Sequence, residues 1–326
     1  MKKKKNKEKE YVSETKEYKK IDLKEKDEIE TIDEVIKKEK NKQRRKTIIK
    51  VKRLIILILL LIACILYARF ISTRGLIIKE YAVKTSELNK DYDGLKIVQI
   101  SDIHYGSTVF KKELKRIVNE TNKQNPDIII FTGDLTEAKV KLTNSEIEFI
   151  TEEFNKFDAS LAYYAIKGNH DYENNYFDTI MTKTKFKILN NESDLLYANS
   201  TTPIRIIGYD DLLKGKPNYK DPLTLPEEME EIPYTILLIH EPDQIDNVLK
   251  VTKDFNIAFA GHSHGGQVRL PFVGAIYTPI GSKKYYDEHY KVENKDLFIS
   301  NGIGTSTLRL RFLNKPSISL FRFYVE

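Results

Sequence analysis

The segment that most constrains the fold is residues 95–106, which read LKIVQISDIHYG. Its first half is a run of β-forming residues, typical of a buried strand in an α/β sheet. Ligands bind just beyond the carboxyl ends of such strands. Asp102 and His104 follow the apolar run two residues apart, so in an extended chain their side chains point the same way. A carboxylate and an imidazole placed like this can bind one divalent metal ion.

Two later segments repeat this pattern of an apolar run that ends in polar residues. Residues 127–134 end in Gly-Asp, and residues 161–171 end in Gly-Asn-His-Asp. Apolar residues at helical spacing separate the three runs, over residues 111–122 and 145–157, with Asn144 or Ser145 as the cap of the second helix. This β-α-β-α-β order predicts parallel strands with right-handed crossovers, which deliver their polar residues to one edge of the sheet.

The second half of the chain has shorter apolar runs. Three of them suggest antiparallel additions because turn residues separate them: residues 186–189, 195–197 and 204–209. Residues 211–233 contain four prolines and read as a surface excursion with a short helix around Glu227–Glu231. Two further strands, over residues 234–239 and 256–260, end at polar residues, and strands over residues 77–84 (an edge strand), 297–300 and 318–324 complete the sheets. Arg309 and Arg311 alternate with apolar residues and are expected on one exposed strand face.

The histidines gather at these predicted strand ends. Five of the six follow a strand directly, accompanied by Asp102, Asp134 and Asn169: they are His104, His170, His240, His262 and His264. A lone histidine in such a place is usually a hydrogen-bonded structural residue, but a shared position for five of them is hard to explain in that way. Oxygen and imidazole ligands without thiolate suit manganese, iron or zinc. They are too many for one tetrahedral site, so two metal ions that share a carboxylate are expected.

The charge of the chain is unevenly distributed. Residues 1–53 hold 21 Lys and Arg against 12 Asp and Glu, so the remainder carries a net charge of −3 although the whole chain carries +6. The basic character therefore gives no argument for nucleic-acid binding by the folded part. The single cysteine, Cys64, excludes an intrachain disulfide and a cysteine-based zinc site.

The amino-terminal region divides into a charged tail and an apolar run. Residues 1–46 are rich in Lys and Glu, which predicts disordered chain or fraying helix. Residues 54–68 contain no charge and extend to a membrane span of residues 54–71 if the flanking Lys and Arg side chains reach the headgroups. A cleavable signal peptide is the alternative, but small residues are poorly placed for cleavage. We expect a disordered tail over residues 1–53, an uncleaved anchor over 54–71 and a folded domain over 79–326.

The order of the polar blocks resembles the calcineurin-like metallophosphoesterase superfamily. Its pattern is D-x-H, then G-D, then G-N-H-D, then a histidine, then G-H-x-H, and this chain has all five blocks between Asp102 and His264. Residues 261–271, GHSHGGQVRLP, further resemble the membrane-associated phosphodiesterases of the YaeI type, relatives of the UDP-diacylglucosamine pyrophosphatases. The resemblance implies a four-layer α/β/β/α sandwich.

The resemblance also implies a role for each motif residue. Asp102, His104 and His264 would hold the first metal ion, and Asp134 would bridge to the second. Asn169, His240 and His262 would complete the second site. A hydroxide between the ions would attack phosphorus. His170 would protonate the leaving oxygen or stabilise phosphoryl charge, with Asp171 orienting its ring or, alternatively, capping the turn.

These features together predict a membrane-anchored, metal-dependent phosphoesterase. The expected substrate has a phosphodiester or pyrophosphate bond and could be lipid-linked, since the domain is tethered to a bilayer. A nuclease of the same superfamily and a non-catalytic membrane scaffold with a structural metal site are the alternatives. Six Lys and Arg lie between residues 44 and 53, against two between 69 and 74. This asymmetry predicts a single-pass protein of the cell membrane with its catalytic domain outside the cytoplasm.

Overall fold

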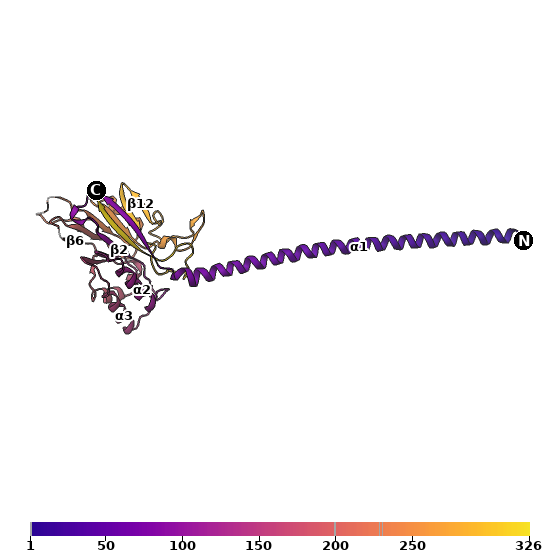
Figure 1. The fold of residues 1–326 in the computed structure, drawn as a ribbon, viewed down its shortest axis with the longest axis horizontal. Coiled ribbons are helices and arrows are strands. Elements are labelled where there is room, and N and C mark those ends of the chain that lie inside the picture. Colours follow the sequence, from indigo (N-terminus) through magenta and orange to yellow (C-terminus); the bar gives the residue numbers. More distant parts are fainter. Residues whose placement is uncertain (1, 199, 228, 230) are drawn as a thin grey trace. The chain divides into compact units, whose positions relative to one another are not determined.

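The protein divides into two compact units. A computed structural model describes residues 2–198, 200–227, 229 and 231–326, with side chains from Ser13 onward except at positions 18, 21 and 23. Unit 1 is Met1–Cys64 and unit 2 is Ile65–Glu326. Figure 1 shows the ribbon of both units, and each is described by itself below.

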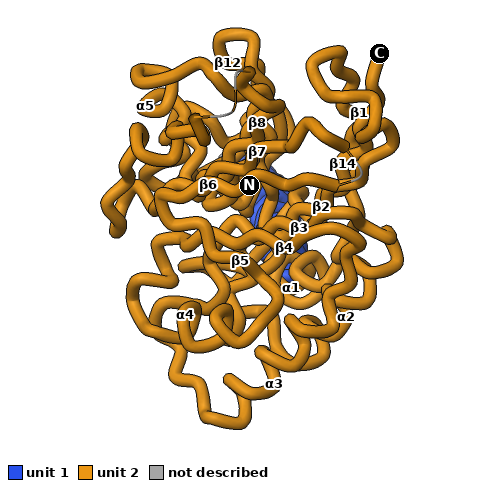
Figure 2. The backbone as a smooth tube through the Cα atoms, turned by 90° about the vertical axis from the view of Figure 1, so that its left-hand side faces the viewer, with its two compact units in different colours: residues 1–64 blue, residues 65–326 orange. Residues whose placement is uncertain are grey.

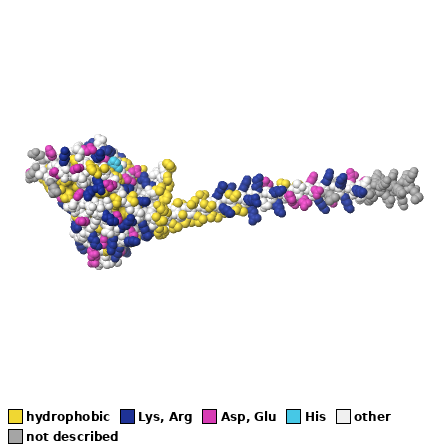
Figure 3. All heavy atoms as spheres, in the orientation of Figure 1, with side chains coloured by type: hydrophobic (Ala, Val, Ile, Leu, Met, Phe, Trp, Pro, Cys, Tyr) yellow, Lys and Arg dark blue, Asp and Glu magenta, His cyan; other side chains and the backbone are white. Residues whose placement is uncertain are grey.

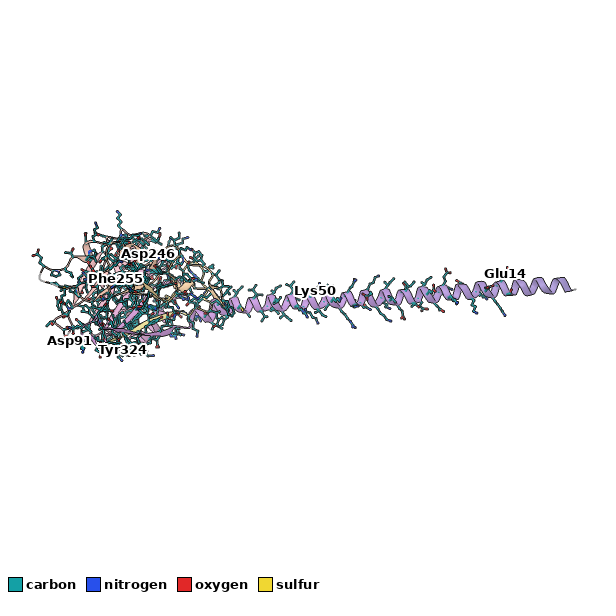
Figure 4. All side chains as sticks on the ribbon, turned by 90° about the horizontal axis from the view of Figure 1, so that it is seen from above. Glu14, Lys50, Asp91, Asp246, Phe255 and Tyr324 are labelled. Atoms are coloured by element: carbon teal, nitrogen blue, oxygen red, sulfur yellow. The ribbon has the colours of Figure 1, made fainter. Side chains whose placement is uncertain are left out.

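Unit 1 belongs to one long helix. Helix α1 is Lys2–Leu66, whereas we expected disorder or fraying helix over residues 1–46 from composition. Lys and Glu are good helix formers, and the Glu34–Lys38 ion pair, 3.8 Å long, has the favourable i, i+4 spacing. Every described side chain from Ser13 to Leu66 is exposed, and Glu14 and Lys50 project freely from the helix axis in Figure 4. The helix propensity of its residues therefore accounts for this helix, since none of the described side chains of unit 1 is buried.

The end of α1 is apolar on all sides. Figure 3 shows charged side chains along the middle of the helix, followed by a continuous band of hydrophobic side chains. Leu54 to Leu66 are all exposed to solvent. The helical stretch Lys24–Arg74 is long and apolar enough to cross a membrane and almost none of its apolar part is buried. An apolar helix without protein around it fits a lipid environment better than water.

Unit 2 contains four further helices and fourteen strands among its described residues. The helices are α2 (Lys111–Asn122), α3 (Asn144–Phe154), α4 (Tyr176–Met181) and α5 (Ile245–Leu249). The strands are β1 (Ile77–Thr85), β2 (Lys96–Ile100), β3 (Ile128–Phe131), β4 (Ala162–Ala165), β5 (Lys187–Ile188), β6 (Glu192–Leu196), β7 (Ile204–Gly208), β8 (Thr235–Leu238), β9 (Ile257–Ala260), β10 (Arg269–Leu270), β11 (Gly274–Ala275), β12 (His289–Val292), β13 (Lys295–Ile299) and β14 (Ser317–Val325).

The first large sheet has the predicted parallel centre. Its strand order is β1-β14-β2-β3-β4-β5, with β1 at the edge as expected. Strands β2, β3 and β4 pair in parallel, with Ile97 opposite Ile128 and Ile128 opposite Ala162. Strand β14 is the one antiparallel neighbour of β2. The carboxyl ends of β2, β3 and β4 therefore lie at one edge, as the β-α-β-α-β pattern requires.

The second large sheet has the order β12-β13-β9-β8-β7-β6. Our expectation of antiparallel additions is correct for β6 with β7 but wrong for β5. Strand β7 pairs in parallel with β8, and β5 pairs in parallel with β4 in the first sheet. Turn residues between short runs suggested hairpins, but the chain crosses from the first sheet to the second between β5 and β6.

The sheets pack face to face and helices cover their outer faces. Helices α2, α3 and α4 pack on the first sheet around a core that includes Phe131 and Phe154. A second core, including Ile130 and Phe259, fills the space between the sheets. Strands β8 and β9 pack their other face on α5 through Val248. Figure 2 shows this order with α2–α4 on one side of β2–β5 and β6–β8 on the other. The predicted four-layer α/β/β/α sandwich is confirmed.

Two local expectations concern single residues. Helix α3 is capped by Thr143, and not by Asn144 or Ser145, because the Thr143 hydroxyl accepts the Glu146 N–H while the Glu146 carboxylate accepts the Thr143 N–H. The short helix expected around Glu227–Glu231 includes Glu228 and Glu230, which lie outside the described residues.

Candidate metal centre

The carboxyl ends of five strands bring the predicted site residues together. Asp102 and His104 follow β2, Asp134 follows β3, and Asn169 and His170 follow β4. His240 follows β8, and His262 and His264 follow β9 in the second sheet. Both sheets therefore contribute side chains to a single polar cluster. This cluster lies at the end of the hydrophobic core between the sheets.

The backbone turns sharply at most of these positions. The φ angle is positive at five of the seven predicted ligand residues: Asp102 (52°), His104 (44°), Asp134 (61°), His262 (63°) and His264 (49°). For residues with a Cβ atom this left-handed conformation costs about 1–2 kcal/mol each, and it concentrates at functional sites. We expected Asp102 and His104 to converge because an extended chain alternates its side chains. They do converge, but through left-handed turns and not through extended chain.

The first group of side chains is formed by Asp102, His104 and His264. Their ligand atoms lie within 4.8 Å of one another, and all three residues are buried. The Nε2 atoms of the two imidazoles are 3.0 Å apart, and His264 Nε2 is 3.6 Å from Asp102 Oδ1.

The second group is formed by Asp134, His240 and His262, again within 4.8 Å and buried. Asp134 also lies close to one histidine of the first group. Its Oδ2 atom is 3.3 Å from His240 Nε2 and 3.4 Å from His104 Nε2. One carboxylate oxygen thus lies between an imidazole of each group, which is where a ligand shared by two metal ions must lie.

Three rings have an acceptor near their outer nitrogen, two through a hydrogen bond and one at ion-pair distance. His240 Nδ1–H donates to the Thr132 carbonyl at 2.6 Å, and His262 Nε2–H donates to the Ile280 carbonyl at 2.7 Å. His104 Nδ1 is 3.2 Å from the Glu137 carboxylate. Acceptors at the outer nitrogen fix the ring tautomer whose inner nitrogen has a free lone pair, as in metal-ligating histidines.

Four buried atoms at the cluster have no hydrogen-bond partner among the described residues. His104 Nδ1 and Glu137 Oε2 face each other at 3.2 Å, and the other two are His240 Nε2, which faces Asp134, and Asn169 Oδ1. Unpaired buried polar atoms are costly, and a bound cation would satisfy His240 Nε2 and Asn169 Oδ1. The glycine before Asn169 makes room for this arrangement, since a Cβ atom at Gly168 would lie 2.4 Å from Asp134 Oδ1 and 2.5 Å from His240 Cε1. The residues present therefore fit divalent metal ions.

Charges within the cluster shift several pKa values. Burial alone would raise the pKa of Asp134, but the imidazoles of His240 and His170 outweigh it and hold that pKa well below its usual range. Burial alone would lower the pKa of His240, but the Asp134 carboxylate raises it well above the ordinary value. Burial lowers the pKa of His262 to about 3, with His240 as the next cause, so this ring is neutral.

His170 lies beside the cluster with its outer nitrogen occupied. Its backbone N–H donates to Asp134 Oδ1 at 2.8 Å, and its ring packs edge-on against His104 at 4.6 Å between centroids. The Ala138 N–H donates to His170 Nδ1 at 3.1 Å. Burial lowers the pKa of His170. The neutral ring therefore carries its proton on Nε2, where it can donate one hydrogen bond.

Asp171 has a different environment from the one we expected. Its carboxylate accepts the backbone N–H groups of Gly168, Asp134 and Leu135 at 3.0, 2.8 and 2.9 Å, and no contact with the His170 ring is recorded in the described part of the chain. The assignment as an orienting partner of His170 is thus not supported, and the alternative of a turn-capping carboxylate matches the structure. Burial raises the pKa of Asp171 to about 7 despite these three hydrogen bonds. Its role is to hold the turns after β3 and β4 together.

Glu137 is a site residue that sequence reasoning missed. Its two carboxylate oxygens lie 3.2 Å from His104 Nδ1 and 3.7 Å from His170 Nδ1. Glu137 thus lies next to the Nδ1 atoms of two histidines, where it can fix the orientation of the His104 ring. The signal was present in the sequence, because Glu137 follows Asp134 by only three residues.

Arg311 is a second missed residue, and our reading of it is corrected. We expected Arg309 and Arg311 on one exposed strand face, and Arg309 is indeed exposed, but Arg311 is completely buried. Its Nη2 atom donates to the carbonyls of Asn301 and Gly304 at 2.8 and 2.6 Å and lies 3.1 Å from His264 Nδ1. Burial lowers the pKa of Arg311 to about 9. His264 thus differs from the other rings because a donor faces its outer nitrogen. Burial and the nearby His104 and Arg311 charges hold its pKa well below the ordinary value.

Comparison with known proteins explains this constellation. Residues 95–266 match the family described as calcineurin-like phosphoesterase, a range that includes every predicted ligand residue. The chain belongs to this family. It is therefore a metal-dependent hydrolase that acts on phosphoric esters, as we predicted.

Three curated relatives show how far the likeness extends. The metallophosphoesterase YkuE of Bacillus subtilis is 33% identical over 78% of this chain and 88% of its own length. A transmembrane protein with a metallophosphoesterase domain from Danio rerio is 26% identical over 73% of this chain and 55% of its own. The UDP-2,3-diacylglucosamine pyrophosphatase LpxG of Chlamydia trachomatis is 26% identical over 72% of this chain and 84% of its own.

The shifted histidine pKa values make metal binding sensitive to pH. His240 retains its proton to higher pH than an ordinary histidine, and so does His104, where burial is outweighed by the Glu137, Asp134 and Asp102 carboxylates. A metal ion must displace these protons, so the affinity for Mn²⁺ should rise as pH increases from 6 toward 8.5 and protons should be released on binding. Calorimetric titration of the full chain in two buffers of different ionisation enthalpy measures both effects. His289→Asn, at an exposed position outside the cluster, should change neither. Binding without pH dependence or proton release would contradict this account.

Proposed function

We propose that this protein hydrolyses a phosphodiester or pyrophosphate bond with a two-metal centre at the strand ends. The observation that carries the proposal is the position of Asp134 Oδ2, 3.3 Å from His240 Nε2 and 3.4 Å from His104 Nε2. A carboxylate oxygen between two groups of ligands, each with imidazoles aimed inward, supports a shared ligand. Manganese, iron or zinc suits this set of oxygen and nitrogen donors.

The geometry supports one assignment of the ligands. Asp102, His104 and His264 would hold the first ion, and Asn169, His240 and His262 the second. Asp134 would bridge the two ions. Two bound ions would lower the pKa of a water molecule between them and neutralise charge on the attacking and leaving oxygens. The protein supplies the orientation, since the turns after five strands and the outer hydrogen bonds of the rings fix each donor before substrate arrives.

For His170 the hydrogen bonds favour one of the two expected roles. Its Nδ1 accepts the Ala138 N–H, so this nitrogen cannot take up a proton while that bond persists. A neutral ring is a poor acid, but its Nε2–H can donate to a phosphoryl oxygen. We therefore assign His170 to stabilisation of phosphoryl charge and not to protonation of the leaving group. The Ala138 N–H keeps the ring in place.

Two observations support a lipid-linked substrate. The helical stretch Lys24–Arg74 is long and apolar enough to cross a membrane, which would hold the hydrolase at a bilayer. A relative that matches 72% of this chain is named for the hydrolysis of a diacylated nucleotide-sugar pyrophosphate. Substrate with acyl chains is concentrated at the same surface, so tethering would favour it over soluble esters.

The activity is tested with an aryl phosphodiester, bis(p-nitrophenyl) phosphate. The full chain in detergent should hydrolyse it when Mn²⁺ is added and lose activity with chelator, because both ions are needed for the attack. Asp134→Asn should abolish activity and reduce metal content at both sites, since its carboxylate lies beside an imidazole of each group. Asp178→Asn, which removes a surface ion pair with Lys167, serves as the control and should retain activity. Metal binding without hydrolysis of this or any lipid-linked ester would favour the structural scaffold instead.

The role of His170 is tested with esters of graded leaving-group quality. His170→Ala should lower kcat by roughly 10²–10³, the range for loss of one donor to developing charge, while metal content stays near normal. Because the proposed hydrogen bond goes to the phosphoryl group, the loss should be similar for good and poor leaving groups, and His170→Gln should recover part of it. A loss that grows steeply as the leaving group becomes poorer would assign His170 to protonation of the leaving oxygen.

The sidedness of the membrane protein is a further part of the proposal. Six basic residues precede the apolar run between residues 44 and 53, so the amino-terminal tail should remain in the cytoplasm and unit 2 should lie outside. Protease added to intact cells or protoplasts should degrade unit 2, followed with an antibody to the carboxyl terminus, while a cytoplasmic marker stays intact. If unit 2 is as well protected as the marker, the active site lies inside and this topology is wrong.

A further inference from the structure

Unit 2 exposes large hydrophobic side chains in two segments near its metal centre. The first is residues 270–280, here called the apolar loop, in which Phe272, Val273 and Ile280 are 110%, 70% and 69% exposed. The second is residues 308–313, here called the second loop, in which Leu308 and Leu313 are 59% and 57% exposed. Contiguous exposed apolar surface of this kind marks an interaction site.

The two loops are joined by backbone contacts. Residues Val268 and Phe312 form a β-bridge, and the Arg269 N–H donates to the Phe312 carbonyl at 2.9 Å. The Gln267 side-chain amide donates to the Leu308 carbonyl at 2.5 Å. The loops thus form one surface and not two separate projections; the ribbon of the apolar loop lies in the orange region of the chain in Figure 1.

The residues that end the apolar run pack against this same surface. Within unit 2, the Arg311 N–H donates to the Ala68 carbonyl at 3.0 Å, and the rings of Tyr67 and Phe312 meet edge-on at 6.4 Å. Tyr67 also lines one cavity together with Arg269 and Leu313. Because the apolar run leads directly into Tyr67 and Ala68, a span that lies in a bilayer must leave it beside the two loops.

We propose that the apolar loop and the second loop form a membrane-docking face that inserts its side chains into the bilayer interface beside the anchor. The occupant is lipid because Tyr67 and Ala68, which end the apolar run, pack against this surface, and exposed aromatic and aliphatic side chains suit the headgroup boundary. Exposed basic residues flank it, which suits anionic headgroups: Arg74, Arg309 and Lys315. The inference rests on the membrane anchorage proposed above and not on the hydrolytic activity.

Docking would also fix the metal centre at the bilayer surface. The apolar loop starts within six residues of His264, and its far end holds His262 through the bond from Nε2–H to the Ile280 carbonyl, 2.7 Å long. The second loop reaches the cluster through Arg311, which lies 3.1 Å from His264 Nδ1. Both loops are therefore attached to the ligand turn after β9. A lipid-linked phosphate could reach the cluster without leaving the membrane.

The chain contains no tryptophan, so a single introduced tryptophan reports its own surroundings. Phe272→Trp places the probe on the docking face, and Tyr277→Trp is a second probe on the same loop. Tyr324→Trp is the matched control: Tyr324 is exposed, and it pairs with Lys84 in β1. Lys84 lies about 23 Å along β1 from Ile77, and Ile77 is the residue of that strand nearest in sequence to the anchor. Tyr324 is therefore remote from the proposed docking face. The full chain is reconstituted into vesicles of phosphatidylcholine and phosphatidylglycerol, with or without bromine on the acyl chains.

Brominated lipid should quench most of the emission of Phe272→Trp and Tyr277→Trp and shift it to shorter wavelength, whereas Tyr324→Trp should remain unquenched by lipid and open to aqueous acrylamide. The proposal is overturned if both loop probes escape lipid quenching. If acrylamide still quenches both probes, the loop is exposed to water. If acrylamide no longer quenches them, a second copy of the chain covers the loop. Either result contradicts docking to lipid. Resistance of the same vesicle-bound protein to alkaline extraction tests the anchor independently, so failure of docking and failure of anchorage are distinguishable.

Discussion

The structure of unit 2 depends on two carboxylates that are buried at adjacent strand ends. Asp102 and Asp134 have 0% and 1% of their surface exposed, and each faces imidazoles from both sheets. Buried like charges at such distances require compensation by positive charge. The rings of His240 and His104, whose pKa values are raised, provide part of it, and two metal ions would provide the rest. The left-handed turns after the strands are the conformational cost of aiming these groups at one point.

This constraint explains why the polar residues outside the cluster are arranged as they are. Asp171 ties the turns after β3 and β4 through three backbone N–H groups, while Thr132 and Ile280 accept hydrogen bonds from the outer nitrogens of His240 and His262. Ile280 lies in the apolar loop, so the same bond that orients a ring also connects the cluster to the exposed hydrophobic surface. The geometry of the site and the proposed membrane-docking face are in this way linked through Ile280.

Much of this could be predicted from the sequence because it is local. Apolar runs that end in Asp, Asn or His indicate both the strands and their functional ends, and helical spacing indicates α2 and α3. The parallel pairings of β5 with β4 and of β7 with β8 could not be predicted, since turn residues do not reveal which strand the next strand will pair with. Arg311 was misread because alternation with Leu310 and Phe312 resembles a strand face, whereas burial beside His264 arises from tertiary contacts. The roles of Glu137 and Asp171 likewise depend on distances across elements.

The most direct test of the account is the position of metal ions around Asp134. Crystals of the full chain grown with Mn²⁺, measured at the manganese absorption edge, should show two anomalous peaks about 3.5–4 Å apart. One should lie among Asp102, His104 and His264, the other among Asn169, His240 and His262, with an Asp134 oxygen ligating both. A single peak, or two peaks of which one has no contact with Asp134, would contradict the bridging carboxylate and with it the proposed two-metal centre.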